Sequence, residues 1–291
     1  MRTRLAALGA VTALLLAACG NAGQEENNPV QNKVEKNAAS TFDKETAMYD
    51  LAKSGKVKIG VKFDQPGLGF KRAGENTPTG FDVEIGKILA AKLGIAASKV
   101  QWVETISDNR EPFLQKGTVD FVVASYSITD ERRKVVGQAG PYYVTGQQLL
   151  VKKGSSIKGV DDLKGKEVCS VTGSTSLKTI EDKGAKGRGF ETYSQCRDQV
   201  LDGAVEAMTT DGSILLGYAA QNPDELEVVG KPFSEERYGV GYNKDKPELC
   251  QFIGDAIKGA EKDGDWAKAF KATLGKSGVK TPKRPAMDPC P

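Results

Sequence analysis

Residues 119–132 read VDFVVASYSITDER, in which an apolar run passes directly into small hydroxyl residues and then an arginine. A short apolar run such as 119–124 is typical of a buried strand. Ser125 and Ser127 place hydroxyl groups after that strand, and Arg132 adds a planar guanidinium that can bind both oxygens of a carboxylate. The stretch therefore predicts a site for a small carboxylate. The alternative is a strand followed by the exposed start of a helix, with the charged residues solvated.

Strands and helices are expected to alternate on both sides of this stretch. The first part of the chain predicts a helix at 44–54, strands at 57–61 and 99–104, and helices at 81–93 and 109–116. The second part predicts strands at 147–151, 167–171, 190–193, 204–210, 226–229 and 238–242, and helices at 174–183, 194–203, 213–221, 248–262 and 266–274. Such alternation indicates mainly parallel sheets with helices on their faces.

The rhythm restarts near residues 152–155, which divides the chain into two α/β units. Two segments, near 145–150 and 238–242, are candidates for crossing between the units. The simplest architecture is an α/β fold of two lobes joined by two extended hinge strands, with the C-terminal helices returning to the first lobe. In open α/β sheets ligands bind outside the carboxyl ends of the strands. A central ligand cleft is therefore expected where two such edges face each other.

Composition excludes several classes of function. The 291 residues are 39% hydrophobic and 27% charged, which suits a globular protein of one or two domains. The net charge is only +3, too small to argue for nucleic-acid binding. The chain has no histidine, which excludes Ser-His-Asp and Cys-His catalysis and removes the commonest zinc ligand. No metal site and no cofactor are expected.

The N-terminus has the features of a targeting signal. Arg2 and Arg4 precede an apolar stretch, 5–18, that is too short to span a bilayer as a mature helix. It ends in Leu-Ala-Ala-Cys at 16–19, which resembles the bacterial lipobox and implies cleavage before a lipidated Cys19. The polar segment that follows, to about residue 42, is expected to be a flexible tether. Ordinary secretion with a chance cysteine is the alternative.

Four further cysteines are expected to pair outside the cytoplasm. Three pairings are possible, and we favour Cys169–Cys196 with Cys250–Cys290, because each closes a loop within one predicted lobe. By the loop-entropy relation each bond would contribute about 3–4 kcal/mol. A metal site is the alternative, although the chain has neither a CxxC pair nor a histidine.

An ordered set of motifs resembles the extracellular solute-binding proteins that supply polar amino acids to ABC importers. The motifs span roughly residues 55–270, and they are GFDVEI at 80–85, ITDER at 128–132, GPYY at 140–143, LKGK at 163–166, TGST at 172–175, TD at 210–211 and YGV at 238–240. Two of its segments, VKFDQPGLG at 61–69 and TTDGSIL at 209–215, most resemble the glutamate-binding lipoproteins of Gram-positive actinobacteria.

The resemblance implies the two-lobed type II fold of periplasmic binding proteins. The expected organisation is a signal peptide at 1–18, a lipidated cysteine and tether at 19–42, the first lobe at 43–146 and 241–291, and the second lobe at 147–240. It also implies an amino-acid site between the lobes.

Particular residues match the ligand-binding positions of the family. Arg132 is expected to bind the α-carboxylate beside Ser127, and the carbonyl of Ser125 to accept from the ligand ammonium. Thr172 to Thr175 form a helix-start loop suited to an anion, although Ser174 could simply cap that helix. Asp211 matches the residue that pairs with the ammonium, its alternative being a cap for the next helix.

Lys62 follows the first strand, where family members place a residue that contacts the ligand side chain. A lysine there favours an acidic side chain, because buried charges need partners; the alternative is that Lys62 points into solvent. Some relatives hold the ligand between two aromatic rings, but the matching positions here hold Gln65 or Leu68 and Ser107. Phe63, Phe70 or Tyr126 are candidates to form the wall instead, the alternative for each being a place in the core. Arg110 matches a common family arginine that we interpret as structural or supporting.

These observations predict the membrane-anchored binding component of an ABC importer, on the extracellular face of a Gram-positive cell. It would capture L-glutamate, or else aspartate or glutamine, by hinged closure, and deliver it to permease subunits driven by a cytoplasmic ATPase. One alternative is an amino-acid sensor that reports to a signalling partner. Another is an enzyme on the same scaffold, which would need Asp211, Glu104 or Lys62 as acid or base. We expect no enzymatic activity.

Overall fold

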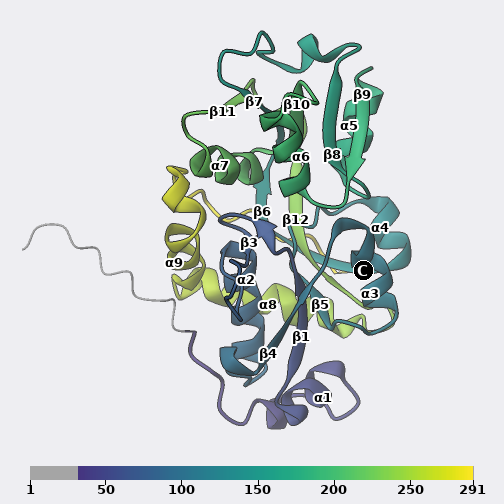
Figure 1. The fold of residues 1–291 in the computed structure, drawn as a ribbon. Helices are drawn as coiled ribbons and strands as arrows, with labels where there is room; N and C mark the ends of the chain where they lie inside the picture. The colour runs from purple at the N-terminus through teal and green to yellow at the C-terminus, as the bar shows by residue number, and fades with distance from the viewer. Residues whose placement is uncertain (1–31, 291) are drawn as a thin grey trace, which may run out of the picture.

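Two five-stranded sheets, one in each of two lobes, organise the computed structural model, which describes residues 32–290 (Figure 1). The expected signal peptide and Cys19 lie outside the described residues. The architecture agrees with the predicted two-lobed α/β fold. Within residues 32–290, no helix combines the length and the hydrophobicity needed to cross a membrane.

The first lobe contains a mixed sheet with the strand order β4-β1-β5-β12-β6. Its strands are β1 (Val57–Val61), β4 (Val100–Glu104), β5 (Phe121–Val122), β6 (Gly137–Thr145) and β12 (Glu236–Tyr242). β1 is parallel to β4 and β5, whereas β12 is antiparallel to β5 and β6. Its helices are α1 (Ala47–Ser54), α2 (Phe81–Lys92), α3 (Arg110–Gln115), α4 (Asp130–Val135), α8 (Glu248–Lys262) and α9 (Asp265–Ala272). The C-terminal helices return to this lobe, as expected.

The second lobe contains a sheet with the order β11-β7-β10-β8-β9. Its strands are β7 (Gln147–Lys152), β8 (Glu167–Val171), β9 (Lys186–Phe190), β10 (Ala207–Asp211) and β11 (Leu226–Val229), and its helices are α5 (Thr175–Asp182), α6 (Tyr193–Leu201) and α7 (Gly212–Gln221). Smaller elements of the chain are the hairpin strands β2 (Asp64–Gln65) and β3 (Gly69–Phe70) and the 3₁₀ helices Ala38–Thr41, Ala97–Lys99, Ser107–Asn109, Val160–Leu163 and Leu274–Ser277. β10 and β8 run parallel, so both end at the edge that faces the first lobe.

The chain crosses between the lobes twice, at Gly146 between β6 and β7 and at residues 230–235 between β11 and β12. β6 and β12 pair along most of their length, from Gly137 opposite Tyr242 to Thr145 opposite Glu236. The paired ribbon connects the two sheets in Figure 1. Both crossings lie close to the predicted hinge segments, but β12 already belongs to the first sheet from residue 236 rather than 241.

Some predicted boundaries differ from the structure. The strand expected over 119–124 is only β5, because the chain turns away at residues 123–125 to place Ser125 in a left-handed conformation (φ 43°). The strand expected at 190–193 lies earlier, at Lys186–Phe190, where glycines obscure the hydrophobic alternation. No strand was predicted over Gly137–Thr145, where the structure has β6, because Gly140 and Pro141 are unusual within a strand.

The polar segment expected to be a tether as far as residue 42 packs on the first lobe over part of its length. Glu35 donates its N–H to the carbonyl of Ala91 at 2.9 Å, and Ala38 is only 5% exposed. The rings of Phe42 and Phe252 meet edge to face, 5.9 Å apart. A few small or aromatic side chains thus suffice to hold a segment whose overall composition is polar.

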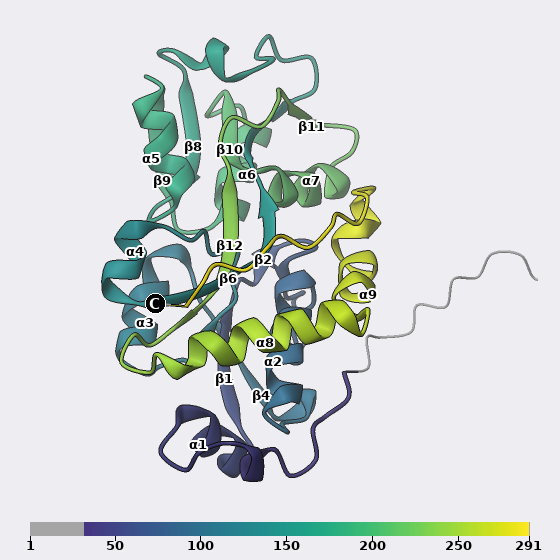
Figure 2. The same ribbon diagram turned by 180° about the vertical axis from the view of Figure 1, so that it is seen from behind.

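Both favoured disulfides are present. Cys169–Cys196 joins β8 to α6 in the second lobe, and Cys250–Cys290 joins α8 to the C-terminal tail. The tail crosses in front of the β6–β12 ribbon in Figure 2. There Asp288 pairs with Arg133 and Arg237, and its N–H donates to the carbonyl of Gly140 at 2.6 Å.

Candidate functional site

A small polar cavity of about 10 Å³ lies between the lobes. That space holds about one water molecule and is far below the roughly 300–1,000 Å³ of typical ligand pockets. The lobes must therefore move apart before an amino acid can enter. The first lobe contributes Ser107, Arg110, Ser125, Ser127 and Arg132, and the second contributes Ser174, Thr175, Ser176, Tyr193 and Asp211. Its charged lining thus consists of two arginines and one aspartate.

The turn after β5 is fixed by a buried carboxylate. Asp82, in the first turn of α2, accepts from the N–H of Ser125 and from the hydroxyl of Tyr142, each at 2.7 Å. The hydroxyl of Ser125 also donates to Gln65 Oε1 at 2.9 Å. Burial raises the pKa of Asp82 to about 7, although the hydrogen bonds from Tyr142 and from the Ser125 N–H lower it. Asp82 and Gln65 therefore hold Ser125 at the cavity without lining it.

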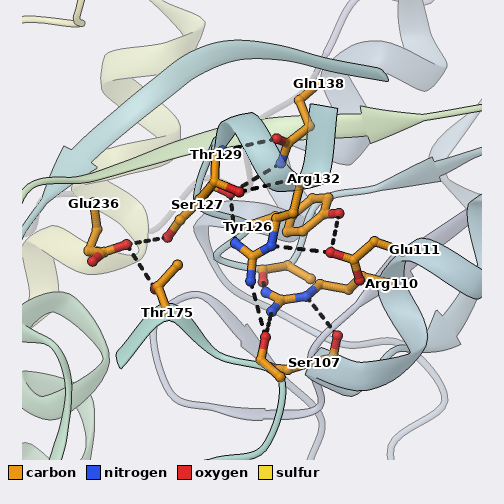
Figure 3. Close-up of polar contacts among 12 residues, drawn as sticks. Ser107, Arg110, Glu111, Tyr126, Ser127, Thr129, Arg132, Gln138, Thr175 and Glu236 are labelled. Carbon is orange, nitrogen blue, oxygen red and sulfur yellow. Dashed lines mark hydrogen bonds and ion pairs between the residues drawn. The ribbon is translucent and has the colours of Figure 1, made fainter. Parts of the chain in front are cut away.

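Arg132 lies in the first turn of α4, which Thr129 caps by accepting the N–H of Arg132 at 3.2 Å. Its Nη1 donates to the carbonyl of Ser127 at 2.7 Å, and its Nε pairs with Glu111 at 3.1 Å. Its Nη2 reaches the second lobe and donates to the carbonyl of Gly173 at 3.1 Å. Figure 3 shows this guanidinium between Glu111 and Ser127. The interactions fix its plane toward the cavity.

Arg110 is a second buried guanidinium, only 3% exposed, at the start of α3. It donates to the carbonyls of Ser107 at 3.1 Å, Ala124 at 3.4 Å and Gly173 at 3.3 Å. The ring of Tyr126 lies close to both arginines, with its centre 4.7 Å from the guanidinium carbon of Arg110 and 4.8 Å from that of Arg132. Burial and the neighbouring Arg132 lower the pKa of Arg110 to about 10. It therefore remains charged at neutral pH.

The second lobe contributes the loop before α5 and the end of β10. Ser174 caps α5 by accepting the N–H of Leu177 at 3.1 Å, as the alternative interpretation expected, and it also lines the cavity. Asp211 ends β10; its Oδ2 accepts from the hydroxyl of Tyr238 at 2.5 Å, whereas its buried Oδ1 has no hydrogen-bond partner within the described part of the chain. Burial first, and then the charge of Glu236, raise the pKa of Asp211 to about 7. Oδ1 is thus a strong acceptor for a donor entering the cavity.

The structure brings five predicted ligand-binding residues to the cavity, namely Ser125, Ser127, Arg132, Thr175 and Asp211. Thr172 is a correction, because it is exposed and its N–H pairs with the carbonyl of Phe190. Lys62 is buried, at 1% exposed, rather than solvated, but it lies one layer behind the lining and donates to Ser107 Oγ at 3.1 Å. Burial and then Arg110 lower its pKa to about 7.

Sequence reasoning underestimated Arg110 and missed Tyr193 and Glu236. Arg110 had been assigned a structural or supporting role, yet it lines the cavity directly. Tyr193 begins α6 and supplies an aromatic wall from the second lobe. Its place at the end of the strand expected over 190–193 was the available signal. Tyr126 does not line the cavity but supports both arginines from behind.

The lobes are closed over this cavity. Besides the bonds of Arg110 and Arg132 to Gly173, Asp64 in β2 accepts from the N–H of Tyr193 at 2.8 Å. Contacts of this kind between lobes would break if the hinge opened. The lining places guanidinium groups at one side and a carboxylate at the other, and these charges complement a small zwitterion that enters when the lobes move apart.

Comparisons with known proteins agree with this geometry. Residues 57–276 match the model of the bacterial extracellular solute-binding proteins, family 3. The chain is 38% identical to the glutamate-binding protein GluB of Corynebacterium efficiens over 235 residues, which cover 76% of this chain and 80% of that one. It is 35% identical to the ABC transporter glutamine-binding protein GlnH of Bacillus subtilis, over 92% and 94% of the two chains.

A solved structure, an ancestral arginine-binding protein bound to glutamine, superposes with a TM-score of 0.71 at 36% identity, over 76% of this chain and 98% of that one. The motifs, the two-lobed fold and these matches agree. The chain belongs to family 3 of the bacterial extracellular solute-binding proteins, near the glutamate-binding proteins of Corynebacterium.

Proposed function

We propose that this protein captures L-glutamate and delivers it to an ABC importer, held at the outer face of the cell membrane by a lipid on Cys19. The single observation that carries the specificity is the charged lining of the cavity, Arg110, Arg132 and Asp211. Two guanidinium groups and one carboxylate complement the two carboxylates and one ammonium of glutamate. Its relatives, named for binding glutamate or glutamine, support the amino-acid class.

Each end of the ligand has a proposed partner. Arg132 would bind the α-carboxylate, beside Ser127. Asp211 Oδ1 would accept from the ammonium, together with the carbonyl of Ser125. Arg110 would bind the side-chain carboxylate, with Lys62 behind it through Ser107. Glutamine would leave one buried guanidinium facing a neutral amide, which weakens the charge-assisted hydrogen bonds.

Calorimetric titration with glutamate, aspartate and glutamine tests the proposal in the wild type, Arg110→Gln, Lys62→Ala and Lys58→Ala. Lys58 lies in β1, the strand that ends directly before Lys62, but its side chain is exposed. Lys58→Ala is therefore the matched control. We expect the wild type and the control to prefer glutamate over glutamine by about ten- to a hundredfold, the range of a hydrogen bond to a charged group. Arg110→Gln should lose most of that preference and Lys62→Ala part of it. A wild type that binds glutamine better would refute glutamate as the ligand.

A further inference from the structure

Glu236 lies behind the cavity lining, at the first position of hinge strand β12, and is only 5% exposed. Its Oε2 accepts from Ser127 Oγ at 2.5 Å and from Thr175 Oγ1 at 3.0 Å. Ser127 belongs to the first lobe and Thr175 begins α5 of the second, and Figure 3 shows the carboxylate between them. One oxygen atom on a hinge strand therefore joins the two lobes.

The other carboxylate oxygen connects the two crossings. Oε1 accepts from Ser234 Oγ at 2.9 Å, and that hydroxyl in turn accepts the N–H of Gln147 at 3.1 Å. Ser234 lies in the crossing that leads to β12, and Gln147 begins β7 directly after the other crossing. The hydrogen bonds of Glu236 thus reach both lobes and both hinge segments. Opening the hinge would separate Ser127 from Thr175, so Oε2 could not keep both bonds.

Hydrogen bonds to an ionised acceptor are roughly twice as strong as those between neutral groups. A buried carboxylate also has a large need for donors, because an unpaired buried charge is costly. In the closed arrangement three hydroxyl groups satisfy Glu236. Its charge therefore favours the arrangement in which all three surround it.

We propose that Glu236 is a latch that stabilises the closed state of the two lobes and slows the release of the bound amino acid. It acts by positioning, through Ser127 and Thr175, and does not itself line the cavity. The effect on release rests on the proposed function. The effect on closure does not, because it depends only on bonds within the chain.

The test compares the purified wild type with Glu236→Gln and with Glu235→Gln, which makes the same chemical change at the exposed neighbouring position. Single-molecule energy transfer between dyes on noncanonical amino acids at exposed positions 116 and 153, one in each lobe, reports closure. Without any added amino acid, Glu236→Gln should have a smaller closed population than the wild type, and Glu235→Gln should match the wild type.

With glutamate as the probe, stopped-flow measurements on Glu236→Gln should show dissociation about ten- to a hundredfold faster and association little changed. Equal closed populations in Glu236→Gln and Glu235→Gln would overturn the latch. Tighter glutamate binding by Glu236→Gln would also overturn it, since the carboxylate would then compete with the ligand. If glutamate binds none of the proteins, the proposed function fails while the closure measurement still decides the latch.

Thr175→Val provides an independent variant in case Glu236→Gln does not fold, which thermal melting would show. It removes the hydroxyl of the second lobe and keeps the side-chain shape. The latch predicts that Thr175→Val also reduces the closed population in the absence of amino acid. It further predicts that the reduction is not additive with that of Glu236→Gln, because one variant removes and the other weakens the same hydrogen bond. A closed population equal to that of the wild type would refute the latch.

Discussion

Replacing Asp211 by asparagine should stabilise the protein without added amino acid and, at the same time, weaken binding. Asp211 is 4% exposed, and its pKa is raised from 3.8 to about 7, by burial first and by Glu236 second. At about 1.4 kcal/mol per pKa unit, ionising Asp211 costs about 4 kcal/mol more in the folded state than in the unfolded state. The ionised carboxylate thus opposes folding until a cation pairs with it. Oδ1 has no hydrogen-bond partner among residues 32–290, and the proposed ligand ammonium would supply that cation.

The sign follows from proton linkage. Because the folded pKa is the higher one, the folded state binds more protons than the unfolded state between pH 4 and pH 7. The contribution of Asp211 to stability therefore falls as the pH rises through this range, by about 2 kcal/mol between pH 5 and pH 7. Asp82, whose pKa is also raised to about 7, adds a similar dependence that the variant retains. The pKa of Lys62 is lowered to about 7, so its contribution to the free energy of unfolding increases as the pH rises above that value.

Urea denaturation of the wild type and Asp211→Asn at pH 5, 6 and 7 measures this effect. The free energy of unfolding of the variant relative to that of the wild type should increase by about 2 kcal/mol over the range. At pH 7 the variant should be more stable by about 1–3 kcal/mol, after about 1–3 kcal/mol is subtracted for an unpaired amide. Calorimetry should show at least a tenfold loss of glutamate affinity. A constant difference between the two proteins across the pH range would refute the reasoning.

Two further predictions concern the frame of the site. Cys250→Ser and Cys290→Ser should each lower the free energy of unfolding by about 4 kcal/mol, because the disulfide closes a separation of 40 residues; an unchanged urea midpoint would contradict this. Gly239→Ala should destabilise the protein by about 1–3 kcal/mol, since the added Cβ would lie 2.7 Å from a side-chain carbon of Ile128. Gly159→Ala, where nothing lies within 4 Å, is the control, and equal melting temperatures for both variants would rule out a packing effect.

The order and type of most elements could be predicted from the sequence, because hydrophobic periodicity and glycine stops are local signals. The errors occurred where tertiary structure overrides them. β6 passes through Gly140 and Pro141 because β12 supplies its pairing partner. The segment near Ala38 is ordered by contacts with α2 and α8, which its polar composition does not show.

The sequence by itself determined which residue types the site has available. The run of hydroxyls ending in Arg132, the helix-start loop before α5, and Asp211 at the end of a strand could each be recognised locally. The cysteine positions also favoured the observed pairing, because the sequence shows which cysteines fall within the same predicted lobe.

Only the tertiary structure decided which of these groups meet. It placed Arg110 at the cavity and Lys62 one layer behind it, and it turned Thr172 outward. It also brought Glu236 against Ser127, 109 residues away, and against Thr175, 61 residues away. Burial, charge pairing and pKa depend on neighbours in space, and these neighbours come from two lobes and a hinge. Local sequence therefore identifies the candidates, whereas the closure of the two lobes determines the role of each.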